Sequence, residues 1–446
     1  MRRMDKQYDK VISGFSKLSK IRKIQWIAET FFNDPNKVAN TLKGYWHSNE
    51  AQQKVLDGFS ENTISNFPMP YGVAPNFVID GKTYAVPMVI EESSVVAAAA
   101  ASAKFWLERG GFTTEILGTK KIGQLHFKYY GPSKILFDIF PELKKFLLEG
   151  AKEITKNMDK RGGGISNIEL IDFSKEEPNY FQIKASFDTC DSMGANFINS
   201  ILEHFGNLLK EFILNRSELK EGEKDVDIIM AILSNFTPEC LVRAKVSCKV
   251  EELGDFPEGT SSEEFAEKFA LAVRIAHLDS YRATTHNKGI FNGVDAVVLA
   301  TGNDFRAIEA CGHTYASKDG KYKSLSNCKV ENGVFTFWLD LPLAVGTVGG
   351  LTSLHPIART SLEMLGKPNA KELMSIITSV GLAQNFAAIR SLVTTGIQQG
   401  HMKMHLQNIL IHMKASNEKT KAAIEYFKDR TVSFSGVRTF LEDVNI

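Results

Sequence analysis

The chain has 446 residues, of which 43% are hydrophobic and 24% charged, and its formal net charge at pH 7 is +1. This length and composition are typical of a globular protein with two or three domains, and the near-zero charge argues against a nucleic-acid partner. The five cysteines are an odd number without a CxxC pair, which argues against a disulfide framework or a zinc site and favours reduced thiols in the cytoplasm.

The first 60 residues are predicted to be helical and polar, with Lys and Arg clustered over 17–23. The simplest interpretation of this cluster is a solvated face, and a phosphate-rich ligand such as coenzyme A is the alternative. The basic residues at the start are not followed by an apolar segment, so no signal peptide is expected. No run approaches 18 apolar residues, so we expect no membrane span.

A predicted strand over 84–90 leads into the turn Glu91-Glu92-Ser93-Ser94 and an alanine-rich helix that Gly110-Gly111 ends. Acidic residues and serines at a helix start are typical of capping and of the helix dipole. That is the structural interpretation of the turn, and a catalytic role for its carboxylates is the alternative.

Residues 115–234 have a different pattern. Strands are predicted over 123–130, 165–173, 181–187 and 227–233, and helices over 142–158 and 197–213. The resulting order β-α-β-β-α-β is the split βαβ, or ferredoxin-like, arrangement. It is predicted to be an insertion within a larger domain.

The second helix of this insertion begins at Asp191-Ser-Met-Gly-Ala-Asn196. A helix N-terminus with small residues offers free N–H groups to a phosphate, although a cap followed by a core helix explains the same pattern. The absence of a GxGxxG sequence excludes a Rossmann fold. Lys160-Arg161 and three glycines form a basic turn that could reach a phosphate or simply lead into the hairpin.

Residues 282–306 combine polar and apolar segments. A buried strand is predicted over 296–300, with Lys288 in a loop before it and Asp304 at the start of a helix after it. If the loop folds back, a lysine held by a carboxylate could stabilise a carbonyl oxygen that becomes negative. An N-cap aspartate and a solvated lysine are the simpler alternative. A glycine-rich turn follows over 341–350.

An apolar helix is predicted over 375–393, and Gly396 and Gly400 mark a break before His401. His401 and His405 have the i, i+4 spacing of a metal-binding pair. No acidic third ligand is close in sequence, so no metal is expected. The tail after 414 is polar, with Phe427, Phe434, Phe440 and Leu441 available to dock.

The segment from Thr285 to Asp304, Thr-His-Asn-Lys-Gly-Ile-x-Asn-Gly-x-Asp-Ala-Val-x-x-Ala-Thr-Gly-Asn-Asp, resembles the central motif of class II hydroxymethylglutaryl-coenzyme A reductases. Further motifs over roughly 60–410 follow in the same order. The resemblance implies an α+β protein with a large mixed α/β substrate domain (1–114 and 235–395), an inserted ferredoxin-like cofactor domain (115–234) and a small helical C-terminal flap (396–446).

The resemblance also implies roles for individual residues. The catalytic residues would be Glu92, Lys288, Asp304 and His401. The substrate would contact Ser94, Arg282, Asn235 and Asn292. NADPH or NADH would contact Asp191, Met193, Gly194, Ala195, Asn196 and, through the basic turn, Arg161.

The implied activity is the NAD(P)H-dependent reduction of hydroxymethylglutaryl-coenzyme A to mevalonate and coenzyme A. A cytoplasmic homodimer, or a higher oligomer of dimers, without a nucleic-acid or membrane partner is expected. Glu61-Asn62-Thr63-Ile64-Ser65 resembles the family's dimer-interface segment but departs from it at Thr63 and Ser65, and Ser16 stands where the family usually has an Arg. Mevalonate oxidation and thioester binding without redox turnover are the alternatives.

Overall fold

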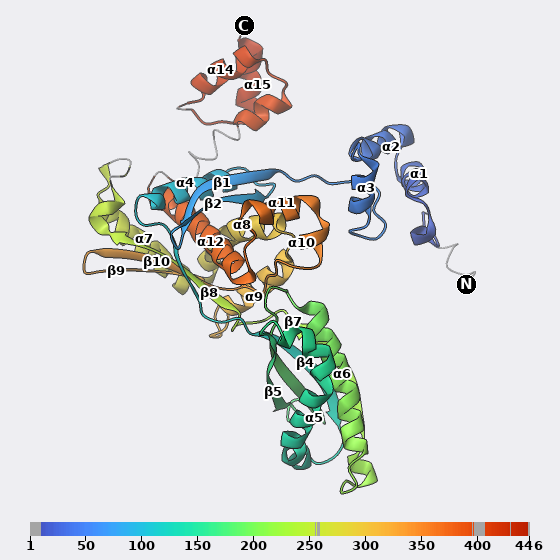
Figure 1. The fold of residues 1–446 in the computed structure, drawn as a ribbon. Coiled ribbons are helices and arrows are strands. Elements are labelled where there is room, and N and C mark those ends of the chain that lie inside the picture. Colours follow the sequence, from blue (N-terminus) through green and yellow to red (C-terminus); the bar gives the residue numbers. More distant parts are fainter. Residues whose placement is uncertain are drawn as a thin grey trace.

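Two four-stranded antiparallel sheets, each with its own hydrophobic core, organise the chain (Figure 1). The computed structural model describes residues 10–254, 256, 259–394, 396, 406–428 and 430–444. As Figure 1 is drawn, the upper sheet has the strand order β3-β8-β10-β9 and the lower sheet has the order β5-β6-β4-β7. Helices and strands are both abundant, in agreement with the predicted α+β class.

The upper sheet buries one face against long helices. Its strands are β3 (Thr113–Ile116), β8 (Leu241–Lys249), β9 (Ser326–Glu331) and β10 (Val334–Pro342). Along β10, Phe335, Phe337, Leu339 and Leu341 are buried and alternate with more exposed residues, as expected for a strand with one covered face. The helices α4 (Val95–Leu107), α7 (Ser262–Leu278), α8 (Ser280–Ala300) and α12 (Ala370–Val393) contribute to the same core.

A two-stranded ribbon, β1 (Tyr71–Ile79) and β2 (Lys82–Val89), packs on helices α4 and α8. The strand predicted over 84–90 is therefore present as β2. Shorter elements complete this part of the molecule: η3 (Val250–Leu253), α9 (Phe305–Ala316), α10 (Leu351–Leu354) and α11 (Pro356–Met364).

Helix α12 is long and apolar enough to cross a membrane by length and composition, but 67% of its most apolar stretch is buried inside the molecule. Side chains on all sides of the helix, such as Leu373, Ile377 and Phe386, are fully buried. It is therefore the core helix of the upper sheet. The apolar helix predicted over 375–393 is thus present as most of α12. Its membrane-like average hydropathy was not expected, because buried polar residues such as Thr378 and Asn385 interrupt the apolar run.

The lower sheet has the split βαβ order that the sequence predicts. Its elements are β4 (Lys121–Tyr129), α5 (Ser133–Asp159), β5 (Gly164–Asp172), β6 (Tyr180–Asp188), α6 (Ala195–Leu214), η2 (Glu221–Glu223) and β7 (Val226–Ser234). Both long helices pack on one face of the sheet and share its core. Helix α5 begins nine residues before the predicted start at 142.

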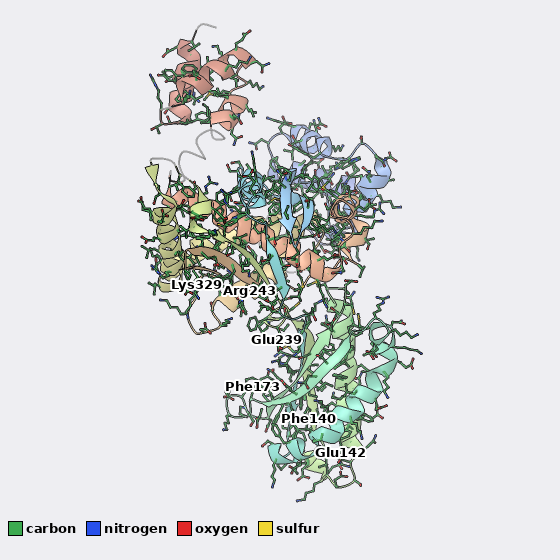
Figure 2. The ribbon with its side chains drawn as sticks, turned by 60° about the vertical axis from the view of Figure 1, so that its left-hand side comes forward. Phe140, Glu142, Phe173, Glu239, Arg243 and Lys329 are labelled. Carbon is green, nitrogen blue, oxygen red and sulfur yellow. The ribbon has the colours of Figure 1, made fainter. Side chains whose placement is uncertain are left out.

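Two chain segments connect the sheets, and Figure 2 labels Glu239 at this junction. The segments run side by side, since the Leu117 N–H donates to the Leu241 carbonyl at 2.8 Å. Lys120 and Glu239 form an ion pair across them at 2.9 Å. Within the upper sheet, Arg243 makes two hydrogen bonds to the carboxylate of Asp340, at 2.6 and 2.8 Å.

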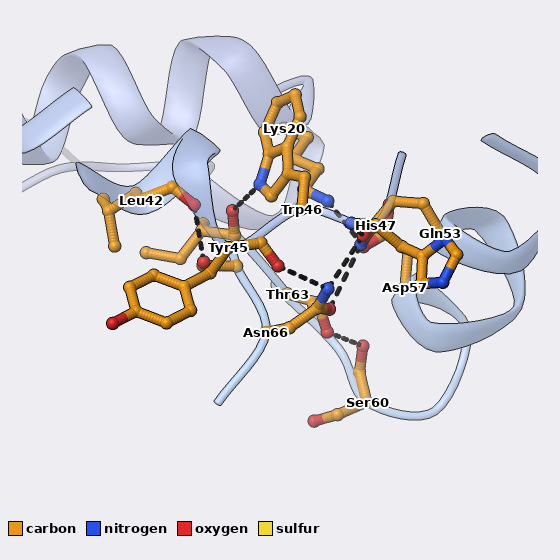
Figure 3. Close-up of polar contacts among 12 residues, drawn as sticks. Lys20, Leu42, Tyr45, Trp46, His47, Gln53, Asp57, Ser60, Thr63 and Asn66 are labelled. Carbon is orange, nitrogen blue, oxygen red and sulfur yellow. Dashed lines mark hydrogen bonds and ion pairs between the residues drawn. The ribbon is translucent and has the colours of Figure 1, made fainter. Parts of the chain in front are cut away.

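The N-terminal region is helical, as predicted, with η1 (Phe15–Lys17), α1 (Lys20–Phe31), α2 (Pro35–Gly44) and α3 (Glu50–Asp57). The side chains of Ser19, Asp34 and Asn49 cap the three α-helices. Figure 3 shows how these helices hold the segment that follows. Trp46 Nε1 donates to the Ile64 carbonyl at 2.9 Å, and Ser65 Oγ donates to the Leu42 carbonyl at 2.6 Å.

The C-terminal part forms a small core of its own. A helix over 406–412 packs with α14 (Asn417–Tyr426) and α15 (Phe434–Asp443). Of the predicted docking residues, Phe427 is buried, Phe440 and Leu441 are partly buried against this core, and Phe434 is exposed.

The predicted strand over 296–300 is wrong, because these residues form the last turns of helix α8. A short apolar run does not distinguish a buried strand from a buried helix. Here Ala296, Val297, Val298 and Ala300 are all buried, so the helix end lacks the polar face that would have marked it. Lys288 consequently lies on a helix and not in a loop.

Candidate active site

Glu92, Lys288 and Asn292 meet where the turn after β2 approaches helix α8. Lys288 Nζ donates to Glu92 Oε2 at 2.6 Å, and Asn292 Nδ2 donates to the same oxygen at 3.4 Å. Lys288 and Asn292 are four residues apart on the helix and therefore share a face. The side chains of Lys288 and Glu92 are 59% and 38% exposed, so a substrate can reach the pair.

Ser94 lies beside this cluster in a strained backbone conformation. It occupies the N-cap position of α4 with φ 76°, and its side chain makes no capping hydrogen bond. A positive φ is costly for a residue with a side chain and persists only where the surroundings impose it. Because the Ser94 hydroxyl makes no capping hydrogen bond, it is free to contact a ligand beside Glu92.

Arg282 lies in the first turn of α8, half-buried. Burial lowers its pKa from the ordinary value. Among the described residues no carboxylate forms an ion pair with its guanidinium group. A partly desolvated guanidinium group of this kind is suited to a carboxylate brought by a substrate.

The buried neighbours of Lys288 fix its helix in place. His286 Nε2 lies 2.7 Å from Ser326 Oγ, which donates to Asn385 Oδ1 at 2.7 Å. Asn287 Nδ2 donates to the Lys323 carbonyl at 2.9 Å. Burial lowers the pKa of His286 to about 3, so its ring is neutral. No role was predicted from the sequence for His286 or Asn287, although both lie within the motif over 285–304.

The expected contact between Asp304 and Lys288 is not formed. Asp304 is the N-cap of α9, where its carboxylate accepts hydrogen bonds from the N–H groups of Arg306 and Ala307 at 3.1 and 3.3 Å. It also pairs with the Arg306 guanidinium at 3.2 Å. Helix α8 continues 12 residues beyond Lys288, a rise of about 18 Å, which carries the chain away before Asp304 is reached.

Asp304 instead lines a cavity of about 480 Å³ between the two sheets, where three turns meet. These are the turns over 191–194, 301–304 and 346–350. Asn303 Oδ1 accepts a hydrogen bond from the Gly346 N–H at 2.8 Å. A Cβ atom on Gly346 would lie 2.5 Å from the Met193 nitrogen, so this close approach requires glycine. Asn303, like His286 and Asn287, has no role predicted from the sequence.

The first turn of helix α6 faces this cavity. Gly194 is its N-cap with φ 93°, and no side chain caps the helix. Met193, Gly194, Ala195 and Asn196 all line the cavity. An uncapped helix N-terminus at a cavity leaves amide groups directed at a ligand and favours a phosphate. This geometry fits the phosphates of a dinucleotide.

Residues 21–406 match the family model described as hydroxymethylglutaryl-coenzyme A reductase. The chain belongs to this family. It is therefore an NAD(P)H-dependent oxidoreductase.

Two reductases are similar in sequence to this chain over nearly its whole length. The 3-hydroxy-3-methylglutaryl-coenzyme A reductase of Archaeoglobus fulgidus is 37% identical over 93% of this chain and 90% of the relative. A probable 3-hydroxy-3-methylglutaryl-coenzyme A reductase of Borreliella burgdorferi is 32% identical over 98% of this chain and 97% of that relative. The solved class II reductase of Streptococcus pneumoniae bound to NADPH in open conformations has a TM-score of 0.70 and 38% identity, covering 86% of this chain and 100% of its own.

In this member of the reductase family, the carboxylate of Asp191 has a structural partner. Asp191 Oδ1 accepts a hydrogen bond from the Ala370 N–H at 2.8 Å, and its carbonyl accepts one from Thr347 at 2.9 Å. Asp191 also lines a second cavity of about 280 Å³, together with Arg161 and Lys371. The basic turn and Asp191, in the turn that precedes α6, therefore line the same cavity.

The remaining predicted reductase residues are not part of the Glu92 cluster. Asn235 is exposed and lines a small cavity with Met193 and Ala195, on the α6 side of the junction. His401 lies outside the described residues. In the part of the chain that the structure describes, no group of three or more His, Cys, Asp or Glu side chains is arranged to hold a metal ion.

Proposed function

We propose that this chain reduces (S)-3-hydroxy-3-methylglutaryl-coenzyme A to mevalonate and coenzyme A, a reaction of the mevalonate pathway for isoprenoid biosynthesis. The first step cleaves the thioester to an aldehyde and coenzyme A, and the second reduces the aldehyde to an alcohol. Each step uses one hydride and one proton. The observation that carries this proposal is the 2.6 Å pair of Lys288 and Glu92, at the two positions to which the resemblance assigns carbonyl reduction.

NADPH or NADH, when bound, supplies the hydrides. Met193, Gly194, Ala195 and Asn196 would hold its phosphates at the N-terminus of α6, since these residues line the cavity there. Asp191 and Arg161 would contact its adenosine end, because both line the adjoining cavity.

Lys288 and Glu92 would act on the carbonyl group. The ammonium of Lys288 would stabilise the carbonyl oxygen as it gains negative charge. Glu92, the hydrogen-bond partner of Lys288, would deliver a proton to that oxygen. Asn292 would keep the Glu92 carboxyl oriented, since it donates to the same oxygen as Lys288.

Asp304 and His401 complete the proposed catalytic set. Asp304 would act on the Glu92–Lys288 pair through its negative charge and at longer range than a hydrogen bond, since its carboxylate is held at the N-cap of α9. His401 would protonate the departing thiolate of coenzyme A, for which imidazole is suited near neutral pH.

The substrate would be positioned by Arg282, Ser94, Asn292 and Asn235. Arg282 would bind the free carboxylate of the hydroxymethylglutaryl group, because it is the half-buried guanidinium of α8. The Ser94 hydroxyl would accept or donate a hydrogen bond beside Glu92. Asn235 would contact the ligand from the junction of the sheets.

We further propose a substrate domain over 1–114 and 235–395, an inserted cofactor domain over 115–234 and a flap over 396–446. The separate cores of the two sheets and of the C-terminal helices support this division. A homodimer, or a higher oligomer of dimers, is proposed from the segment 61–65, which the N-terminal helices hold in place. A cytoplasmic location is proposed from the five free cysteines. A fully active monomer in sedimentation experiments would contradict the dimer.

The test follows the absorbance of the reduced nicotinamide while hydroxymethylglutaryl-coenzyme A is added. We expect two NAD(P)H molecules to be consumed and one mevalonate to be formed for each thioester. Binding of the thioester without a change in absorbance would mean that the chain is a thioester-binding protein. The initial rate of thioester reduction is then compared with the initial rate of mevalonate oxidation, and the faster reaction is the preferred direction.

A further inference from the structure

Lys121 is a buried lysine to which the catalytic steps above give no role. It is the first residue of β4, and only 5% of its surface is exposed. It lines both the small cavity beside Met193 and the larger cavity beside Arg161. Lysine is rarely buried to this extent unless an opposite charge accompanies it.

The ammonium of Lys121 holds the turn that leads into helix α6. It donates to Thr189 Oγ1 at 2.5 Å and to the Ser192 carbonyl at 2.7 Å. Thr189 Oγ1 itself donates to the Ser192 carbonyl at 2.6 Å. A Cβ atom on Gly194 would lie 2.5 Å from the Thr189 side chain. Lys121, Thr189 and the backbone of the turn thus form one closely packed unit.

No carboxylate among the described residues forms an ion pair with Lys121. The two nearby acidic side chains are engaged elsewhere. Asp188 accepts hydrogen bonds from Thr119 Oγ1 and the Cys190 N–H, and Asp191 accepts one from the Ala370 N–H. Burial lowers the pKa of Lys121, and these nearby acids together with Cys240 and Cys190 oppose that shift. A buried cation without a contacting anion is costly to the fold.

We propose that Lys121 is a positioning residue for the dinucleotide: it holds the turn that would bind the pyrophosphate, and its positive charge favours that anion from behind the turn. This inference rests on the proposed function, in which the 191–196 turn holds the phosphates. Lys121 acts through the turn: it fixes Thr189 and the Ser192 carbonyl, and its charge lies behind the helix N-terminus, adding to the helix dipole. NADPH and NADH share the pyrophosphate, so Lys121 serves both equally.

The test compares Lys121→Met with Lys121→Arg and with the control Lys120→Met. Lys120 is the adjacent lysine, but it is exposed and paired with Glu239 across the surface. Dissociation constants for NADPH and NADH are measured by calorimetry, without turnover. We expect Lys121→Met to weaken both by the same factor, about 10- to 100-fold, the effect of losing a charge-assisted hydrogen-bond network. Lys121→Arg should recover part of the loss, and Lys120→Met should bind as the unaltered chain does.

Thermal unfolding without ligand separates this role from a purely structural one. Replacing an uncompensated buried charge by an apolar side chain of similar length should leave the Tm unchanged or raise it. The stabilisation by added NADPH should shrink at the same time. A Tm that falls in Lys121→Met and is not restored by Lys121→Arg would mean that the lysine only supports the fold.

Three further outcomes would overturn the inference. Equal dissociation constants in Lys121→Met and the unaltered chain would remove Lys121 from the cofactor site while leaving the proposed function intact. Failure of both Lys121→Met and Lys121→Gln to fold would make the lysine structural. If the unaltered chain bound neither dinucleotide, the proposed function itself would fail.

Discussion

The Lys288 ammonium lies 2.6 Å from the Glu92 carboxylate, although 196 residues separate the two in sequence. Helix α8 brings Lys288, and the turn after β2 brings Glu92. With both side chains open to solvent, this pair contributes little to stability. Its consequences should therefore be seen in the chemistry and not in the folding of the chain.

Replacing Lys288 by alanine should lower kcat by about 10²- to 10³-fold, because a donor to the developing oxyanion is removed. Thermal unfolding should be nearly unchanged, since the side chain is 59% exposed. Lys268→Ala is the matched control: this lysine also pairs with a glutamate at 2.6 Å and is 50% exposed. A loss of activity of less than about tenfold would remove Lys288 from the oxyanion role.

NADPH should be accepted at least as well as NADH, because Arg161 can pair with a 2′-phosphate that NADH lacks. Arg161→Ala should weaken NADPH binding and leave NADH binding unchanged. This separates Arg161 from Lys121, whose replacement should affect both. The measurement is the dissociation constant of each dinucleotide, and a strong preference for NADH that survives Arg161→Ala would contradict the assignment.

His401→Gln should cost about 10²- to 10⁴-fold on the thioester, because the thiolate would depart without a general acid. Added mevaldehyde has no thiolate to protonate, so its reduction should be much less affected. His405→Gln serves as the control and should be mild on both substrates. Equal losses on the thioester and on mevaldehyde would assign His401 another task, such as holding a lid closed.

His286 should make the chain less stable as the medium becomes acidic. Its pKa is about 3 in the folded chain, against an ordinary value of 6.5. Between these values the unfolded chain binds a proton that the folded chain excludes, so stability falls as the pH drops from 6.5 toward 3. His286→Asn should flatten the dependence of Tm on pH in that window. An equally steep dependence in the variant would show that other groups cause it.

Asp295 should have the opposite effect. Burial and the charge of Glu309 raise its pKa well above the ordinary 3.8, and its Oδ1 is buried without a hydrogen-bond partner. The folded chain therefore binds a proton that the unfolded chain releases, and stability falls as the pH rises from 3.8 toward about 8. Asp295→Asn should raise the Tm more at about pH 8 than at about pH 5. A Tm gain that is the same at both values would contradict a protonated Asp295.

Sequence patterns predicted the lower sheet well because its strands alternate and its helix α6 carries a continuous apolar stripe. They failed for the end of α8, where Ala296, Val297, Val298 and Ala300 are all buried and the polar face of a surface helix is missing. That error placed Lys288 in a loop and led to the expected contact with Asp304. The strands β3, β8, β9 and β10 were not predicted, because the pairing of β3 with β8 joins residues as far apart as Thr113 and Lys245, and that of β8 with β10 joins residues as far apart as Leu241 and Pro342.

The hydrogen-bond partners of individual side chains were less predictable than the helices and strands. The motif around Lys288 identified the lysine, but only the fold shows that Asn292 and Lys288 donate to one oxygen of Glu92. Lys121 has no sequence signal at all, since a lysine at a strand start is ordinarily a solvated residue. Its burial follows from the 189–194 turn, which folds over it.

Gly346 packs the turn that carries Asp304 closely against the turn that leads into α6. Its N–H is bound to Asn303, and its α-carbon lies against the backbone of Met193 without room for a methyl group. The methyl group of an alanine at this position would clash with the Met193 backbone and would displace the start of α6 from the turn that carries Asp304. In the proposed function, the missing methyl group of Gly346 would therefore set how closely the cofactor-binding turn approaches the turn that carries Asp304.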